Sequence, residues 1–392
     1  MGASIPLLFS SMIRPFPGIW SVVHGSLWTA GTGLHGQRER FKLLSKGTDM
    51  RPVSVWTIFL ALPVVVLAVA GCMAVPVTVI TQGTPHLVAP CGTSEGSGQR
   101  RCETLSFGGV ERNYRVYVPA KLGEPAPVLV VLHGYFQDAA RMEATTGKGI
   151  YQLADVAGAL VVYPNGVGTH WNAAPATEQP SEGSDKRNVD DVGFLRTLVA
   201  SIGQGYSVDP ERVFVAGFSN GGQMALRLAC EAPDVYRGIV AVAITMRKAL
   251  AGNCHPSVAR RVALFKGTAG GYTGGGGFIG AEATAATFSA IAGCSGVKVE
   301  PWRPNDDINP TNVVVHRATG CPDGLGFVLF EIKDGLHHWP GGMPDAPTMA
   351  TRVKSQQQPE DQLDANKEIR HFLGLGVARH ESQASQASGA LH

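Results

Sequence analysis

The chain has 392 residues, of which 44% are hydrophobic, and its formal net charge is +2. This length allows one large domain or two ordinary domains with a sizeable buried core. Because the sequence has neither a long basic run nor basic residues alternating with aromatic ones, it predicts no nucleic-acid partner.

The N-terminal segment predicts export. Residues 1–49 show no hydrophobic period, and we interpret them as an over-extended reading frame with Met50 as the true start. Residues 50–72 join a short positive start to an apolar stretch that ends in small residues before Cys72, as secretory signals do. The ending, Val69-Ala-Gly-Cys72, resembles the lipobox of bacterial lipoproteins, in which the cysteine is lipidated.

The alternative for residues 50–72 is a single transmembrane anchor, because no charged residue lies between Arg51 and Glu95. Pro63 and the small residues before Cys72 favour a cleaved signal instead. Both alternatives place the rest of the chain outside the cytoplasm, in the periplasm or the extracellular space.

Three further segments follow the signal. Residues 73–100 are rich in Pro, Thr, Gly and Ser and predict a linker. Residues 101–374 predict one folded domain. Residues 375–392 are rich in Ser, Ala and Gln and predict a disordered tail.

Strands and helices alternate along the predicted domain. Apolar runs without alternation predict strands that are covered on both faces, and apolar residues at helical spacing predict the helices between them. This order predicts an α/β fold with a mostly parallel central sheet and helices on both faces. The predicted strands are Thr104–Phe107, Asn113–Val118, Val128–Leu132, Ala159–Tyr163, the run before Gly217, Gly238–Ile244, Val262–Lys266 and Phe327–Ile332; the predicted helices contain Ile150 to Ala157, Leu195 to Val199 (capped by Asp190 or Asp191), Met224 to Leu228 and Ile369 to Leu373.

The stretch Gly217-Phe-Ser219-Asn-Gly221 stands between a predicted buried strand and a predicted helix. A Gly-x-Ser-x-Gly sequence in this context is typical of the nucleophile elbow of the α/β-hydrolase fold, where the serine is exposed on a sharp turn. The following helix would point its N-terminus at the oxyanion that forms during acyl transfer. We therefore predict Ser219 as a nucleophile.

A histidine pair follows the last predicted strand, at His337 and His338. In α/β-hydrolases the triad order is Ser, acid, His, so this position predicts that one of the two is the general base.

These features together resemble the polyhydroxybutyrate depolymerase and feruloyl esterase-like group of α/β-hydrolases. The resemblance covers residues 101–374 and implies secreted serine esterases that act on polymer or plant-phenolic esters. It selects His337 as the base, with His338 in the position of a family threonine. The matching stretches are Tyr114-Arg-Val-Tyr-Val-Pro119, Val131-Leu-His-Gly134, Val162-Tyr-Pro-Asn-Gly166, Val189-Asp-Asp-Val-Gly-Phe194, Val208 to Gly222 and His337-His-Trp-Pro-Gly-Gly342.

The resemblance also implies disulfides. It pairs Cys230 with Cys254 and Cys294 with Cys321, which leaves Cys91 with Cys102. An even number of cysteines after a signal is typical of an oxidising compartment. No cysteine or histidine spacing predicts a metal site, and the implied chemistry needs no cofactor.

The chain departs from the family at the triad acid. Gly270 stands where the family has an aspartate, within the run Gly267-Thr-Ala-Gly270-Gly271. We expect another carboxylate to take its place, and Glu282 is the first candidate because it follows the same loop. The alternatives are Asp306, Asp307 and Asp334.

Backbone N–H groups are expected to form the oxyanion hole, from Asn220 and from Tyr135 after the strand that ends at Leu132. His133 is expected to be structural. Trp171 and Asn172 are predicted to line the substrate pocket, or alternatively to form a turn held by a partly buried tryptophan.

The sequence thus predicts an exported serine esterase whose partners are an ester substrate, polymeric or small, and a membrane reached through the lipid or anchor. The alternative is an envelope lipoprotein that keeps the fold, binds, and catalyses weakly or not at all, since Gly270 replaces the expected acid. No particular oligomeric state is predicted.

Overall fold

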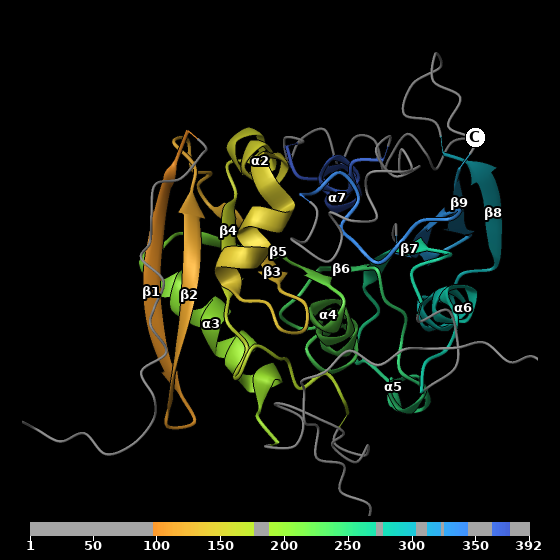
Figure 1. Ribbon diagram of the computed structural model, residues 1–392, viewed down its shortest axis with the longest axis horizontal. Helices are drawn as coiled ribbons and strands as arrows, with labels where there is room; N and C mark the ends of the chain where they lie inside the picture. Colours follow the sequence, from red (N-terminus) through yellow and green to blue (C-terminus); the bar gives the residue numbers. More distant parts are fainter. Residues whose placement is uncertain are drawn as a thin grey trace, which may run out of the picture. The chain divides into compact units, whose positions relative to one another are not determined.

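A ten-stranded sheet runs through the part of the chain that the structure, a computed structural model, describes (Figure 1). The described residues are 97–175, 188–271, 277–302, 312–322, 325–343 and 363–376. The predicted segments 1–49 and 50–72, nearly all of the predicted linker, Cys72, Cys91, and residues 377–392 lie outside them.

The strands follow the order β1-β2-β4-β3-β5-β6-β7-β10-β9-β8. The six from β4 to β10 are parallel, and an antiparallel pair flanks them at each edge. This confirms the predicted α/β fold with a mostly parallel sheet. The strands are β1 (Gln99–Phe107), β2 (Val110–Val118), β3 (Ala126–Leu132), β4 (Leu160–Pro164), β5 (Val208–Phe218), β6 (Gly238–Val242), β7 (Arg261–Gly267), β8 (Gly296–Pro301), β9 (Val313–Thr319) and β10 (Phe327–Ile332).

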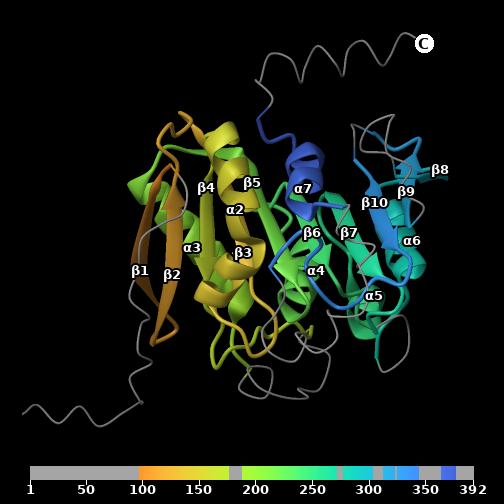
Figure 2. The ribbon, with the colours of Figure 1, turned by 45° about the horizontal axis from the view of Figure 1, so that its top comes forward.

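Helices cover both faces of this sheet, and the two views in Figures 1 and 2 show them on opposite sides. Helices α2 and α7 share one hydrophobic core with the sheet, and α3, α4, α5 and α6 share the other. Their bounds are α2 (Ala139–Ala157), α3 (Asp191–Gly205), α4 (Asn220–Glu231), α5 (Lys248–Asn253), α6 (Ala281–Ile291) and α7 (Ala365–Leu373).

The prediction was incomplete at the edges of the sheet. Strand β8 is almost entirely exposed, so it lacks the apolar pattern that marks a strand in sequence. Strand β1 starts at Gln99, before the predicted Thr104. The side chains of this strand are exposed or half-buried, so its first residues carry no apolar pattern that would mark the start in sequence. At the other end, Leu375 is 2% exposed and packs in the core, although we had placed it in the tail.

The parallel strands end at one edge of the sheet, which is where α/β proteins bind ligands. The loops after β3, β4, β5, β7 and β10 therefore meet there. The β8–β9 connection opens at the same edge, since the Lys333 N–H donates to the Asn312 carbonyl at 2.7 Å. Asp306 and Asp307, two candidates for the acid, belong to this connection and lie outside the described residues.

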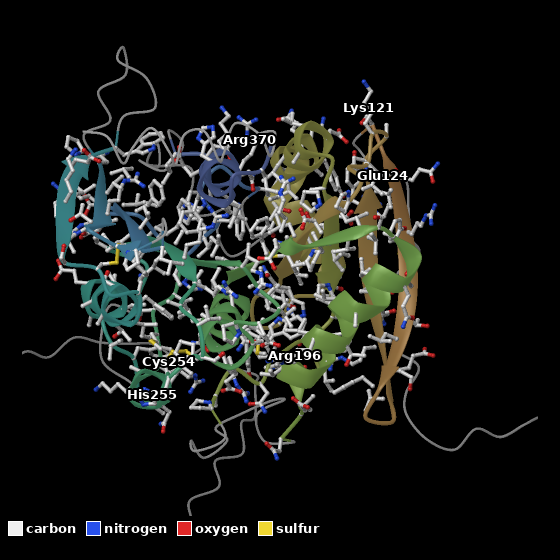
Figure 3. The ribbon with its side chains drawn as sticks, turned by 180° about the vertical axis from the view of Figure 1, so that it is seen from behind. Lys121, Glu124, Arg196, Cys254, His255 and Arg370 are labelled. Atoms are coloured by element: carbon white, nitrogen blue, oxygen red, sulfur yellow. A yellow bond between two sulfur atoms is a disulfide. The ribbon has the colours of Figure 1, made fainter. Side chains whose placement is uncertain are left out.

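Two predicted disulfides are confirmed. Cys230–Cys254 joins the end of α4 to the segment after α5, near the Cys254 label in Figure 3. Cys294–Cys321 joins the segment after α6 to that after β9. Cys102 is also disulfide-bonded, and its predicted partner Cys91 lies outside the described residues. In the described ranges, no helix has the length and apolar character needed to cross a membrane.

Candidate active site

Ser219 lies on a strained turn between β5 and α4. Its φ of 52° and ψ of −115° fall in a region that L-residues rarely adopt. The surrounding bonds hold this conformation, because the Ser219 N–H donates to the Val242 carbonyl at 2.9 Å and the Ser219 carbonyl accepts from Gln223 N–H at 3.0 Å. Strain of this kind costs about 1–3 kcal/mol and is concentrated at functional sites.

The two glycines of the motif allow the close backbone approach that this turn needs. A Cβ atom on Gly217 would lie 2.2 Å from the Gly221 carbonyl oxygen. A Cβ atom on Gly221 would lie 2.4 Å from the carbonyl oxygen of Leu132 and 2.5 Å from that of His133. The elbow is therefore packed directly against the loop that follows β3.

His337 meets Ser219 across this edge of the sheet. Its Nε2 atom lies 2.9 Å from the Ser219 Oγ atom, within hydrogen-bond distance. The ring of Phe218 packs against the imidazole with centroids 5.2 Å apart. The structure thus brings together the two residues that were predicted as nucleophile and base.

The loop that carries His337 is fastened to the loop after β7. The Ala269 N–H donates to the Gly335 carbonyl at 3.0 Å, and the Asp334 N–H donates to Thr268 Oγ1 at 2.8 Å. On its other side, the buried Trp339 donates from Nε1 to Asn366 Oδ1 at 3.0 Å. His337 therefore stands between two attachments, the bonds to the β7 loop before it and the Trp339 side chain after it.

The loop after β3, residues 133–137, is ordered by His133; we call it the oxyanion loop because it carries Tyr135, a predicted oxyanion donor. This fully buried ring accepts from the Gly166 N–H at Nε2 (2.9 Å), and its Nδ1 lies 2.8 Å from the Gly134 carbonyl. Burial lowers the pKa of His133 to about 4, so the ring is neutral at pH 7. Its bonds and its charge state fit the structural role that was expected.

The side chain and the backbone of Asn220 take part in different contacts. The side chain binds the main chain of Trp171 on both sides, accepting from its N–H at 2.7 Å and donating to its carbonyl at 3.1 Å. The backbone N–H belongs to the first turn of α4, where N–H groups lack intrahelical acceptors. It is therefore suitably placed to meet an oxyanion beside Ser219.

Residues 107–308, just over half of the chain, match the model of a protein family described as "Putative esterase". The chain belongs to this esterase family. Among its relatives is "Putative esterase NocK" of Nocardia uniformis subsp. tsuyamanensis, which is 32% identical over 257 residues, or 60% of this chain and 72% of the relative.

Two further relatives match a smaller part of this chain and of their own length. A poly(3-hydroxybutyrate) depolymerase of Ralstonia pickettii is 33% identical over 187 residues, which are 44% of this chain and 36% of the relative. Feruloyl esterase B of Piromyces equi is 26% identical over 230 residues, or 54% of this chain and 39% of the relative. The chain thus spans well under half the length of these two. The family match and these relatives confirm the predicted group and make the protein a carboxylic ester hydrolase.

Gly270 of this esterase lies against the backbone of the His337 loop. A Cβ atom there would be 2.8 Å from the Leu336 carbonyl carbon and oxygen and 2.9 Å from the His337 N atom. Such contacts are shorter than real Cβ atoms show, so the loop would have to shift to admit any side chain. The two loops therefore approach each other so closely here that only glycine fits without a shift.

The described acid candidates lie in different places. Glu282, in the first turn of α6, has its carboxylate within 4.8 Å of His316 and Glu331. His316 Nε2 in turn lies 2.9 Å from Glu331 Oε2. Asp334 is exposed, and its backbone N–H donates to Thr268 Oγ1 in the β7 loop. The structure therefore places Glu282 in a cluster with residues of β9 and β10, and gives Asp334 a role in shaping the loop.

Trp171 and Asn172 of the esterase are buried, with 1% and 8% exposure. Trp171 donates from Nε1 to the His133 carbonyl at 3.0 Å, which links the loop after β4 to the oxyanion loop. Asn172 donates from Nδ2 to the Val189 carbonyl at 2.8 Å. These contacts favour the alternative of a turn held by a buried tryptophan.

Sequence reasoning missed the role of Asp191. Asp190 is the helix cap, accepting from the Gly193 N–H, while Asp191 accepts from Arg112 and from the Asn172 N–H at 2.8 and 2.7 Å. Burial raises the pKa of Asp191, against the opposing influence of Arg112. The adjacent pair Asp190-Asp191 could have indicated this role. A helix N-cap uses one carboxylate, so the second aspartate was available for another contact.

Proposed function

We propose that this esterase is an exported serine hydrolase that cleaves carboxylic esters through an acyl-enzyme on Ser219. The observation that carries the proposal is the 2.9 Å contact between Ser219 Oγ and His337 Nε2 at a strained elbow. A hydroxyl beside an imidazole can lose its proton as it attacks a carbonyl carbon, which is how serine nucleophiles are activated.

The reaction proceeds in two halves. Ser219 Oγ attacks the ester carbonyl while His337 takes the hydroxyl proton, and the alcohol leaves with that proton. Water then attacks the acyl-enzyme, giving its proton to His337, and Ser219 leaves as the hydroxyl when the acid is released. The N–H groups of Asn220 and Tyr135 are proposed to hold the oxyanion of each tetrahedral intermediate.

The orientation of His337 has support from described residues. Phe218 packs against its ring, and the backbone bonds between the β7 and β10 loops fix its main chain. A base held in place in this way approaches the nucleophile without a search through side-chain rotamers, which is the advantage of preorganisation.

The relatives' names support a proposal for the substrate class. They act on poly(3-hydroxybutyrate) or are named feruloyl esterases, so we propose a polyhydroxyalkanoate or a feruloyl or other aryl ester.

The acyl-enzyme is tested by product partitioning. para-Nitrophenyl butyrate and phenyl butyrate share an acyl group and differ in the leaving group. Hydrolysed in the presence of methanol, both are expected to give the same ratio of methyl butyrate to butyric acid, because both pass through one intermediate. A ratio that changes with the leaving group would mean that water attacks the ester directly.

Export and lipidation at Cys72 are the second part of the proposal. The disulfides at Cys230–Cys254 and Cys294–Cys321 support an oxidising compartment. Cells expressing the full chain and fed an alkyne fatty acid are expected to label the protein, with labelling lost in Cys72→Ala. Equal labelling of the variant would rule out lipidation at this cysteine.

A second candidate is a hydrolase-fold envelope lipoprotein that binds and catalyses weakly, and Gly270 favours it because the family acid is absent at that position. Covalent trapping of Ser219 with a fluorophosphonate distinguishes it from the esterase.

A further inference from the structure

Phe136, within the oxyanion loop, combines two unfavourable features. Its side chain is 77% exposed, and its φ is 61°, in the left-handed region. A bulky residue with positive φ is a true outlier, and glycine would adopt this conformation without strain. The fold therefore leaves most of this ring outside its packing, which points to a use outside the fold.

The surrounding contacts hold Phe136 in this conformation. Its N–H donates to the Thr169 carbonyl at 3.1 Å, and Thr169 itself has a φ of 64°. Two strained residues on facing loops thus support each other. Strain that persists in this way is typical of sites where a side chain must be presented in one direction.

Three rings meet at this point and form what we call the aromatic shelf: Tyr135, Phe136 and His170. Tyr135 contacts both others edge to face, with centroids 4.2 Å from Phe136 and 3.7 Å from His170. Phe136 lies 5.3 Å from His170. Rings packed this closely restrict one another's directions.

The shelf is joined to both proposed oxyanion donors. Tyr135 is one of them, and His170 precedes Trp171, whose main chain is bound by the Asn220 side chain. The His133 carbonyl packs against Gly221 of the elbow. Phe136 follows His133 by three residues, so about 10 Å at most separates the two along the chain. A substrate held at Ser219 has the shelf within reach.

His170 supplies a polar atom to the shelf. The residue is 7% exposed, and its Nε2 atom has no hydrogen-bond partner among the residues that the structure describes. Buried polar atoms are nearly always paired, so an exception calls for an explanation. Its Nδ1 atom faces the Gly168 carbonyl, which only accepts, so in the neutral ring Nε2 is left as an acceptor. A bound group that carries a hydroxyl would pair it.

We infer that the aromatic shelf binds a ring of the substrate next to the scissile ester, with the exposed face of Phe136 as the main contact. The inference rests on the proposed function and adds a specificity-determining residue to it. A ring stacked on Phe136 gains both buried apolar area and ring–ring contact, whereas a methyl or ethyl group gains little.

The test uses two variants that remove the ring and keep the backbone. Phe136→Gly relieves the strain, and Phe136→Asn tolerates a positive φ. Phe136→Tyr keeps the ring, and Val258→Ala, a 40% exposed residue in the segment before β7, is the surface control. Each is assayed on two substrate pairs, phenyl acetate with methyl acetate and methyl cinnamate with methyl butyrate.

We expect the Gly and Asn variants to raise KM about 10-fold, or about 1.4 kcal/mol, for the ring-bearing member of one pair. The pair affected shows whether the ring belongs to the alcohol or the acyl side. The ring-free member of that pair should show a much smaller change, so the ratio of the two KM values should rise about 5-fold or more. Phe136→Tyr should keep the wild-type ratio, and Val258→Ala should leave both KM values unchanged. Equal changes for ring-bearing and ring-free esters would overturn the inference.

Thermal unfolding supplies the second readout. Phe136→Gly should raise Tm by about 1–3 °C, because it removes backbone strain while little packing is lost. A lower Tm would show that the ring serves the fold and would also overturn the inference. If wild type hydrolyses none of the four esters, the proposed function itself fails, which is a different result from a missing ring effect.

Discussion

Alanine at Ser219 or at His337 is expected to lower kcat/KM for a good ester substrate by about 10⁴–10⁶-fold. The two side chains act as one unit, since Oγ becomes nucleophilic only as Nε2, 2.9 Å away, receives its proton. The remaining rate comes from the oxyanion hole and substrate binding. Initial rates with para-nitrophenyl butyrate, on protein of matched Tm, measure the loss.

Two comparisons sharpen this prediction. The double variant Ser219→Ala/His337→Ala should be no slower than either single variant, because removing one member already disables the unit. His338→Ala, a change at the adjacent residue, should stay within about 3-fold of wild type, in the range of ordinary surface substitutions. A large loss in His338→Ala with a small loss in His337→Ala would reverse the assignment of the base.

The second large effect is expected at Gly270. A Cβ atom there would press on the Leu336 carbonyl and the His337 N atom at 2.8–2.9 Å, so Gly270→Ala should push the base away from Ser219. A misplacement of about 1 Å can cost about 10²-fold, and we expect kcat to fall by at least that factor. The same steric reason predicts that Gly270→Asp, which restores the family residue, lowers activity rather than raising it.

Gly252→Ala is the control for these variants, because an added Cβ at this position in α5 meets no atom within 4 Å. Its activity should equal that of wild type. Higher activity in Gly270→Asp would contradict the account, because it would show that the loop has room for the acid and that the wild-type site lacks it.

The parts of the site that could be predicted from sequence are those with a local cause. Gly217 and Gly221 flank Ser219 because the turn itself excludes side chains, so the motif and its geometry are inseparable. The buried strands β3 and β10 were also found, since strands covered on both faces consist of apolar residues. His337 was found from its place after β10.

The parts that were missed depend on contacts remote in sequence or on exposed residues. Asp191 holds Arg112, 79 residues away, and a capping aspartate looks the same in sequence as one that binds an arginine. Strands β8 and β9 lie at the edge of the sheet, and the exposed side chains of β8 carry no periodic pattern. Nothing local marks Phe136, because positive φ in a bulky residue is imposed by the facing loop.

The surroundings of the acid candidate Glu282 could not be predicted from sequence either. Glu282 follows the β7 loop in sequence, yet it lies in the first turn of α6, and its carboxylate lies near the imidazole of His316 on β9 and the carboxylate of Glu331 on β10. Helix α6 carries Glu282 on the face of the sheet that α3 and α4 also cover, and its role as the triad acid stays a prediction. Gly270 shows the converse, since its closeness to His337 is visible only in the packing of two loops.

Covalent trapping of the nucleophile tests the central claim most directly. Wild-type protein treated with a fluorophosphonate should gain one adduct, located on Ser219 by peptide mass spectrometry. The adduct should be absent in Ser219→Ala and should form at least about 10²-fold more slowly in His337→Ala, where no base removes the proton. Wild-type protein that stays unlabelled, or an adduct on another residue, would contradict the assignment of Ser219 as an activated nucleophile.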